Sequence, residues 1–222
     1  MTSLNKIFYS LKHNYDFILF NQPFYKSWFV KPAWNKIPLI KSQLSSYDWI
    51  IWIDSDALVL LHQVDLDQII EESLKRDPNK NGEINLIISY DRNGLNSGIM
   101  AIRNCKWSHQ ILNNVLSWKY FLYSMHWYAE QTPLVMELEH GKSQNVRVAL
   151  KSFLNSYMYD YKEGKSFIFH LAGCNKYEGN LCASIMRNFY ENWRERNVTT
   201  VEDRELLRKT EIIYDGVSGG GS

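Results

Sequence analysis

Apolar residues recur along the chain with two spacings, and together they predict an α/β fold. Helical spacing predicts a helix from the N-terminus through about His13 and further helices over 34–44, 64–75, 107–121, 127–139 and 183–193. Short apolar runs rich in β-branched and aromatic residues predict strands over 16–20, 49–53, 84–90, 99–102, 146–150 and 166–171. We expect a single domain over about 1–200, followed over 201–222 by a charged helix or tail and a Gly/Ser linker.

The run Trp49–Ile53 is apolar without interruption, which predicts a strand buried on both faces, as in a parallel sheet. It stops at Asp54-Ser55-Asp56, and apolar residues resume at Ala57. Two carboxylates this close repel each other and lose hydration on burial, and a divalent cation removes both costs. Because Asp is a hard oxygen ligand and ligands sit where strands of open α/β sheets end, this pattern favours Mg²⁺ or Mn²⁺. The alternative is an Asp-rich turn that caps a helix.

Two further segments are candidates for anion or ligand binding. Lys36 lies in the first turn of a predicted helix, where a cation can meet an anionic ligand; the alternative is a solvated helix face. Gly94 and Gly98 bracket Asn96-Ser97, which indicates a tight backbone that presents amides and side chains outward. An ordinary hairpin-like loop explains that spacing equally well.

Three polar residues at the ends of predicted elements complete the candidates. Glu130 and Gln131 lie at a helix entrance, where capping and compensation of the helix dipole are the alternative roles. His170 comes near the end of an apolar strand, where a histidine can be purely structural. It would also complete Asp54 and Asp56 as a third metal ligand from a neighbouring strand end.

Composition narrows the class of protein. The 222 residues include 25 Lys and Arg against 24 Asp and Glu, so no nucleic-acid footprint is indicated. No apolar run is long enough to span a bilayer and no signal-peptide pattern opens the chain, so we expect it to be soluble as given. Three cysteines make no disulfide framework; Cys174 and Cys182 are close enough in sequence to pair, and a reduced state is equally compatible.

Four stretches, taken in order, resemble the galactosyl/xylosyl transferase family (glycosyltransferase family 34-like) that includes yeast Golgi α-1,2-galactosyltransferases and plant xyloglucan xylosyltransferases. The similarity covers most of the chain, from about Lys6 to Cys174. The N-terminal domain of a multidomain chlorella-virus glycosyltransferase is also similar in size. The matching stretches are 34–39, 52–57, 94–98 with 103–107, and 170–174, with Glu130-Gln131 and 154–157 as further matches.

The resemblance implies a GT-A fold, in which helices flank a central, mostly parallel mixed sheet. It also implies a retaining glycosyltransferase that uses Mn²⁺ or Mg²⁺ and moves a sugar from a nucleoside-diphosphate sugar, usually a UDP-sugar, to a glycan hydroxyl. A strand that helps to hold the nucleobase is expected before Met1. Further domains in a longer protein fit this pattern, and a cytoplasmic location is favoured over the Golgi lumen.

Site residues follow position by position from the same resemblance. Asp54, Asp56 and His170 would hold the metal, which bridges the diphosphate oxygens. Glu130 and Gln131 would be catalytic, near the anomeric carbon, although the family usually has Asp where Glu130 stands. In the family a Lys directly follows Gly-Cys, whereas here Asn comes first and Lys second. The residues assigned to donor binding are Lys36, Ser55, Asp91, Asn96, Ser97, Gly98, Gly173, Asn175 and Lys176.

Two other functions compete with sugar transfer. A carbohydrate- or nucleotide-binding module could keep this fold without turnover. A metal-dependent hydrolase would need more carboxylates or histidines around a water nucleophile than the sequence offers.

Overall fold

A computed structural model describes residues 1–75, 83–126, 128–139, 143–174 and 181–218 of the chain. The fold divides into two compact units, each with a hydrophobic core of its own. Unit 1 consists of Met1–Asn21, Asp54–Leu66 and Ser152–Ser222, and unit 2 consists of Gln22–Ile53 and Asp67–Lys151.

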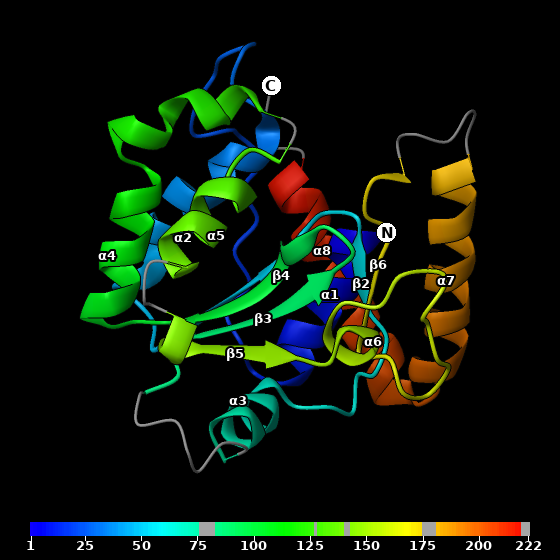
Figure 1. Cartoon of the computed structure of the whole chain (residues 1–222). Coiled ribbons are helices and arrows are strands. Elements are labelled where there is room, and N and C mark those ends of the chain that lie inside the picture. The colour runs from blue at the N-terminus through cyan, green and yellow to red at the C-terminus, as the bar shows by residue number, and fades with distance from the viewer. Residues whose placement is uncertain (76–82, 127, 140–142, 175–180, 219–222) are drawn as a thin grey trace. The chain divides into compact units, whose positions relative to one another are not determined.

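Unit 2 is built on a four-stranded sheet with the order β1-β4-β3-β5, of which Figure 1 shows β4, β3 and β5 side by side. Strand β4 pairs antiparallel with β1 and with β3, and β3 pairs parallel with β5. The predicted α/β class, with a mixed sheet flanked by helices, is confirmed, although antiparallel pairs outnumber the parallel one in this sheet. The strands are β1 (Trp49–Ile53), β3 (Leu86–Asp91), β4 (Gly94–Arg103) and β5 (Val146–Ala149).

Strand β1 corrects one expectation from the sequence. It was predicted to be buried on both faces within a parallel sheet, but it lies at one end of the strand order, pairs antiparallel with β4, and is half-buried along its length. An apolar run indicates that a strand avoids water, but the direction of its neighbour is set by how the chain connects the two strands. Here the hairpin of β3 and β4 returns the chain antiparallel to β1.

The helices of unit 2 cover this sheet and form the core with it. Helix α4 packs on both α2 and α5, with α2 against β1 and α5 against β4. The core includes Ile37, Ile88, Met100, Ile111 and Leu138. The predicted helix over 107–121 is two elements, because α4 ends before a separate 3₁₀ segment. The bounds are η1 (Pro32–Asn35), α2 (Lys36–Leu44), α3 (Leu66–Lys75), α4 (Lys106–Val115), η2 (Trp118–Met125), α5 (Gln131–Glu139) and η3 (Ser143–Asn145).

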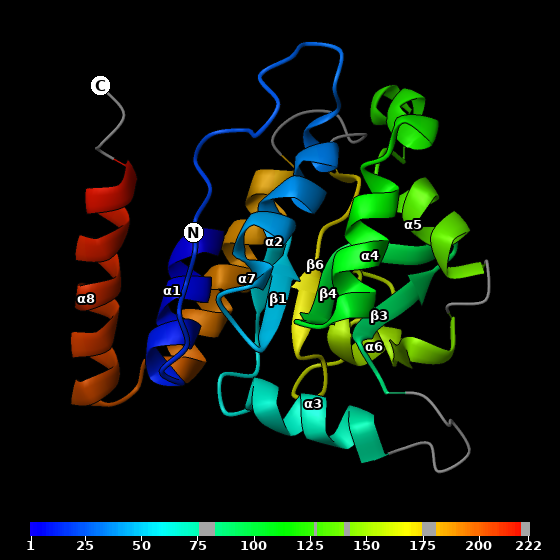
Figure 2. The same cartoon turned by 90° about the vertical axis from the view of Figure 1, so that its left-hand side faces the viewer.

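Unit 1 contains a two-stranded antiparallel sheet of β2 (Ala57–Val59) and β6 (Ile168–His170). Helix α1 packs against β2 and against α8, which lies beside it in Figure 2. The core joins Phe8, Leu58, Phe169, Trp193 and Leu207. The helices are α1 (Thr2–Lys12), α6 (Lys151–Leu154), α7 (Leu181–Asn197) and α8 (Val201–Ser218), and α6 begins at the boundary between the units.

Two predictions at the chain ends have different outcomes. The strand predicted over 16–20 is wrong: those residues adopt no regular structure, because a strand needs a hydrogen-bonded neighbour and this run pairs with no strand in the described part of the chain. The segment after residue 200 forms a helix whose Leu207 is buried in the core of unit 1. The division into a domain over 1–200 and a tail over 201–222 stays a prediction.

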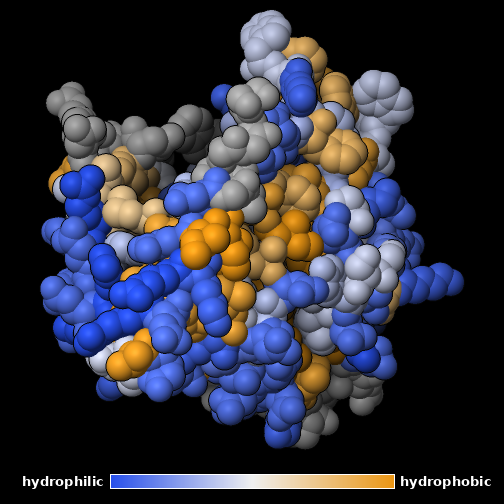
Figure 3. All heavy atoms as spheres, turned by 180° about the vertical axis from the view of Figure 1, so that it is seen from behind, coloured by the Kyte–Doolittle hydropathy of each residue, from blue (hydrophilic) through white to orange (hydrophobic). Residues whose placement is uncertain are grey.

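One face of the molecule is mostly polar. Figure 3 shows blue, hydrophilic side chains over much of the visible face, with smaller groups of hydrophobic ones between them. No helix in the described part of the chain combines the length and the apolar character that crossing a membrane requires.

Candidate functional site

The predicted metal ligands come together within unit 1. Ligand atoms of Asp54, Asp56 and His170 all lie within 4.8 Å of one another. The pairing of β2 with β6 places Ala57 opposite His170, so the turn that precedes β2 lies beside the end of β6. The amide of Leu171 donates a hydrogen bond to the carbonyl oxygen of Asp56 at 2.9 Å and fixes this arrangement.

The imidazole of His170 is buried and held from both sides. Its Nε2 lies 3.2 Å from Oδ1 of Asp56, and its Nδ1 lies 2.8 Å from Oδ1 of Asn155. Burial acts to raise the pKa of Asp56, but a hydrogen bond with His170 and the attraction of its ring when protonated, together with a backbone hydrogen bond and the charge of Lys6, lower the pKa below its ordinary value. The Asp56 side chain remains 46% exposed, so the site is open to solvent on the aspartate side.

A lysine that the sequence did not indicate also belongs to this cluster. The Lys6 ammonium, on α1, donates a hydrogen bond to the carbonyl oxygen of Asp54 at 2.6 Å. Burial lowers the pKa of Lys6 to about 8, against the opposing charges of Asp54 and Asp56. This cation partly balances the two carboxylates, and a single Lys within an amphipathic helix gives no signal for that role.

The donor set fits a hard divalent cation. Two carboxylates and a neutral imidazole suit Mn²⁺, and carboxylates suit Mg²⁺. Three protein ligands are fewer than an octahedral ion takes, so other oxygen atoms can occupy the remaining positions.

The other predicted donor-binding residues of unit 1 have separate outcomes. Ser55 is exposed in the turn between the two aspartates. Gly173 has a φ of +69°, and a Cβ there would meet nothing within 4 Å, so backbone conformation rather than space favours glycine at this turn. Asn175 and Lys176 lie outside the described residues.

The sequence left the pairing of Cys174 and Cys182 open, and the structure joins them in a disulfide. Disulfides persist mainly in oxidising compartments, so this bond weighs against the predicted cytoplasmic location. The location itself stays a prediction.

Predicted site residues of unit 2 form a second, buried cluster around Glu130. Its Oε1 lies 3.0 Å from the Lys36 ammonium and accepts a hydrogen bond from the Ser97 hydroxyl at 2.7 Å. Lys36 also donates to the carbonyl oxygen of Ser97 at 2.9 Å, and the Ser97 amide donates to Oε1 of Gln131 at 3.3 Å. The ammonium of Lys36 therefore serves an internal ion pair in this structure, while Gln131 remains only half-buried.

Asp91, Asn96 and Gly98 belong to the hairpin of β3 and β4. The side-chain amide of Asn96 donates to Oδ2 of Asp91 at 2.9 Å, and the backbone amide of Gly98 donates to Oδ1 of Asn96 at 3.0 Å. From the sequence we expect a loop around Asn96-Ser97, but the turn of the β3–β4 hairpin lies earlier, between Asp91 and Gly94. Asn96 and Gly98 lie within β4 rather than in a loop, so these contacts organise the strand and its turn.

Two features mark Glu130 as unusual. Its Oε2 is buried and has no hydrogen-bond partner among the described residues. Ala129, directly before it, has a φ of +34°, a strained conformation for a residue with a Cβ. Strained backbone and unsatisfied buried polar atoms concentrate at functional sites. A sequence gives no signal for either feature.

Comparison with known proteins identifies the family. The model of the galactosyl transferase GMA12/MNN10 family matches residues 1–181. An alpha-1,2-galactosyltransferase of Schizosaccharomyces pombe is 29% identical over 78% of this chain and 56% of its own length. Galactomannan galactosyltransferase 1 of Cyamopsis tetragonoloba is 32% identical over 49% of this chain and 25% of its own length. Xyloglucan 6-xylosyltransferase 4 of Arabidopsis thaliana is 35% identical over 36% of this chain and 16% of its own.

A solved structure shares the fold. A glycosyltransferase involved in the glycosylation of the major capsid of PBCV-1 superimposes with a TM-score of 0.65, at 17% identity, over 86% of this chain and 90% of its own. The predicted resemblance to yeast galactosyltransferases, plant xylosyltransferases and a viral glycosyltransferase is confirmed. The aligned regions span at most 56% of the lengths of the three relatives above.

Proposed function

The chain belongs to the galactosyl transferase GMA12/MNN10 family, and from this premise we propose that it is a glycosyltransferase. It moves a sugar from a nucleoside-diphosphate sugar, a UDP-sugar, to a hydroxyl group of a glycan, with retention of anomeric configuration. The observation that supports this most strongly is the convergence of Asp54, Asp56 and His170 within 4.8 Å in a chain of this family.

In this proposal the three residues of unit 1 hold Mn²⁺ or Mg²⁺. A bound divalent ion supplies charge that stabilises a diphosphate leaving group. The chain's own part is to fix the ligands: the pairing of β2 with β6 sets their spacing, and Lys6 restrains the turn at Asp54. Rigid placement of ligands before the donor binds reduces the reorganisation that catalysis requires.

The other roles rest on the resemblance alone and remain proposals. Gln131, rather than Glu130, is the better placed of the pair to touch a substrate, because Glu130 is 2% exposed and paired with Lys36. The donor-binding roles of Lys36, Asn96 and Ser97 would require them to exchange contacts that they make within unit 2.

Calorimetry of UDP binding with and without Mn²⁺ tests the metal-dependent part of this proposal. We expect Mn²⁺ to strengthen UDP binding to the wild type, and Asp56→Asn to remove that effect while the protein stays folded. Asp48→Asn is a matched control, because it makes the same change at an exposed carboxylate outside the cluster. Equal UDP affinity with and without Mn²⁺ would contradict the metal's role.

Incubation with UDP-sugars and glycan acceptors tests turnover. Transfer, or slow hydrolysis of the donor, is the expected result, and the anomeric configuration of the product reports retention. Donor binding with neither transfer nor hydrolysis would instead identify a nucleotide-sugar-binding module.

A further inference from the structure

The segment Asn155-Ser156-Tyr157 has no role in the function described so far, yet each of its residues contacts His170. We infer that Asn155 is a positioning residue: it fixes the tautomer of His170 so that Nε2 presents a lone pair to the metal. This inference rests on the proposed metal site and names a residue outside its ligand set.

The backbone of the segment is fastened beside β6. The Ser156 amide donates to the carbonyl oxygen of Ile168 at 2.9 Å, and the His170 amide donates to the carbonyl oxygen of Ser156 at 2.8 Å. Ser156 also forms a parallel bridge with Phe169. Because these bonds hold the backbone next to Asn155 against the backbone of His170, the two side chains are kept close together.

The side-chain contact defines which nitrogen carries the proton. Oδ1 of Asn155 lies 2.8 Å from Nδ1 of His170, and both residues are buried. An amide oxygen only accepts hydrogen bonds, so Nδ1 is the donor. In the neutral imidazole the other nitrogen, Nε2, then carries a lone pair.

That lone pair points toward the carboxylate of Asp56. Nε2 lies 3.2 Å from Oδ1 of Asp56, so two acceptors face each other when the imidazole is neutral. A cation that binds both atoms satisfies both lone pairs. The opposite tautomer would instead place a hydrogen on Nε2, donate it to Asp56 and close the position to metal. Metal-ligating histidines generally donate their second N–H to an acceptor for this reason.

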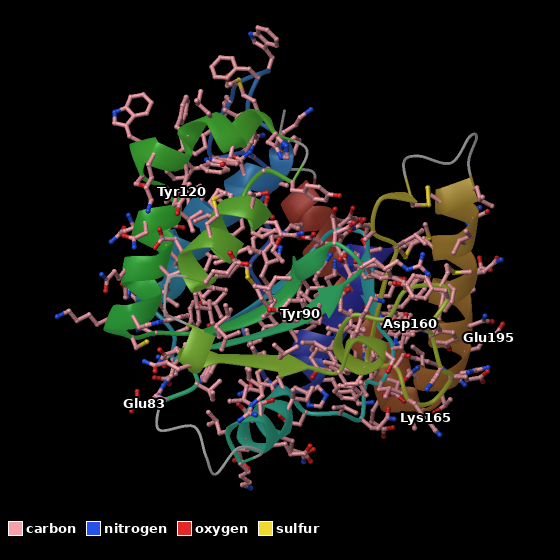
Figure 4. The ribbon with its side chains drawn as sticks, in the orientation of Figure 1. Glu83, Tyr90, Tyr120, Asp160, Lys165 and Glu195 are labelled. Carbon is pink, nitrogen blue, oxygen red and sulfur yellow. A yellow bond between two sulfur atoms is a disulfide. The ribbon has the colours of Figure 1, made fainter. Side chains whose placement is uncertain are left out.

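Tyr157 completes the restraint on the ring. Its ring meets the imidazole edge-on, with centroids 5.7 Å apart and an interplanar angle of 81°. The Tyr157 amide donates to Oδ1 of Asp160, which lies in the loop between α6 and β6 (Figure 4). The ring of His170 is thus bounded by Tyr157 while Asn155 sets its protonated edge.

Two measurements test the inference, one with metal and one without. Calorimetry of Mn²⁺ binding compares the wild type with Asn155→Leu, Asn155→Asp and Thr210→Val. We expect Asn155→Leu to weaken Mn²⁺ binding by about 10- to 100-fold, the usual loss for such a partner. Asn155→Asp keeps an acceptor at Nδ1 and should stay within a few-fold of the wild type. Thr210→Val removes another buried polar group of unit 1, on α8, whose hydroxyl donates to the carbonyl oxygen of Leu206, and should bind Mn²⁺ as the wild type does.

Nitrogen NMR of the metal-free protein reports the tautomer directly. The neutral imidazole of His170 should carry its proton on Nδ1 in the wild type and in Asn155→Asp, and should shift toward the Nε2–H form in Asn155→Leu. An Nε2–H tautomer in the wild type, or unchanged Mn²⁺ affinity in Asn155→Leu, would overturn the inference. If the wild type bound no Mn²⁺, the metal-dependent proposal would fail, while the tautomer would still decide the role of Asn155. Should Asn155→Leu not fold, the wild-type spectrum and Asn155→Asp decide it.

Discussion

The ion pair of Lys36 and Glu130 is almost removed from water, with 4% and 3% of the two side chains exposed. Burying both charges costs hydration, which their attraction and the hydrogen bonds of Ser97 offset. Loss of one partner destabilises the protein far more than replacement of both, because the single charge left behind is buried without compensation.

Removing the cation should therefore destabilise unit 2 strongly. We expect Lys36→Met to lower the free energy of unfolding by about 3–5 kcal/mol, because it leaves the Glu130 carboxylate buried without its cation. The double variant Lys36→Met/Glu130→Gln should recover much of that loss. Urea unfolding followed by tryptophan fluorescence measures both.

Lys75→Met is the matched control, because Lys75 pairs with Glu71 on the surface, where the two side chains are 76% and 66% exposed. Its effect should stay within about 0.5 kcal/mol. A Lys36→Met effect as small as that of the control would show that the buried pair adds nothing to stability.

His62 makes the stability of the protein depend on pH. Its ring is fully buried among aromatic rings of Phe8 and Trp193, and burial lowers its pKa to about 3. In the unfolded chain its pKa is about 6.5. Between these values the unfolded state binds the extra proton, so stability falls as pH drops from about 6.5 toward 3, by up to about 1.4 kcal/mol per pH unit.

His62→Phe should flatten this dependence. The ring is kept, and the Val59 carbonyl oxygen that His62 contacts still accepts from the Asn5 side chain at 2.8 Å. Free energies of unfolding in urea, measured from about pH 7 to about pH 5, should fall less steeply for the variant. Parallel curves for variant and wild type would show that other groups cause the acid sensitivity.

The cluster of Asp54, Asp56 and His170 could be singled out from the sequence because each residue ends or follows an apolar run, and its role in metal binding stays a prediction. Asp54 and Asp56 lie in the three residues that follow the apolar run over 49–53. His170 comes directly after the apolar residues 167–169. Lys6 and Asn155 could not be identified in this way. The contact of Lys6 with Asp54 depends on how α1 packs, and the contact of Asn155 with His170 depends on how the segment before β6 packs, and local sequence pattern encodes neither. The strain at Ala129 is likewise a product of tertiary structure.

At the scale of elements, sequence pattern was most informative where an element has its own periodicity. The helices α1, α2 and α3 and the strands β3 and β5 lie close to their predicted ranges. Strand β2 spans only Ala57–Val59, too few residues to show a period, and it exists because β6 pairs with it. The antiparallel pairing of β1 depends on chain connection, as does the division into two units.

The packing of strand β6 should hold His170 in place for the proposed metal site. Phe169 precedes His170, is fully buried, and stacks on Phe189 with ring centroids 3.8 Å apart. We expect Phe169→Ala to cost about 3–5 kcal/mol of unfolding free energy and also to weaken Mn²⁺ binding, because β6 loses the packing that places His170. Chemical denaturation and calorimetry measure the two effects.

Val148→Ala, at a position 48% exposed on β5, serves as the control and should change stability by no more than about 0.5 kcal/mol. If Phe169→Ala lost stability but bound Mn²⁺ unchanged, the position of His170 would not depend on this packing.

At the scale of the whole molecule, the chain passes between the two units after Asn21, Ile53, Leu66 and Lys151. Neither unit is therefore a continuous segment of the chain, and the residues at these crossing points do not form a Gly-, Ser- or Pro-rich linker that would indicate a boundary. Each unit nevertheless has its own core, and all three proposed metal ligands belong to unit 1. Binding of an ion should consequently stabilise unit 1 first.

Hydrogen exchange with and without Mn²⁺, read by mass spectrometry, tests this. A ligand at about 100 times its dissociation constant stabilises the state that binds it by about 2.7 kcal/mol, or about 100-fold in the opening equilibrium. Amides of β6 and its neighbours, including those of His170 and Leu171, should gain protection by up to that factor, because opening this region releases the ion. The strands β3 and β4 of unit 2 should gain less. Equal gains in both units would mean that the units open only together, and a gain confined to unit 2 would place the bound ion away from Asp54, Asp56 and His170.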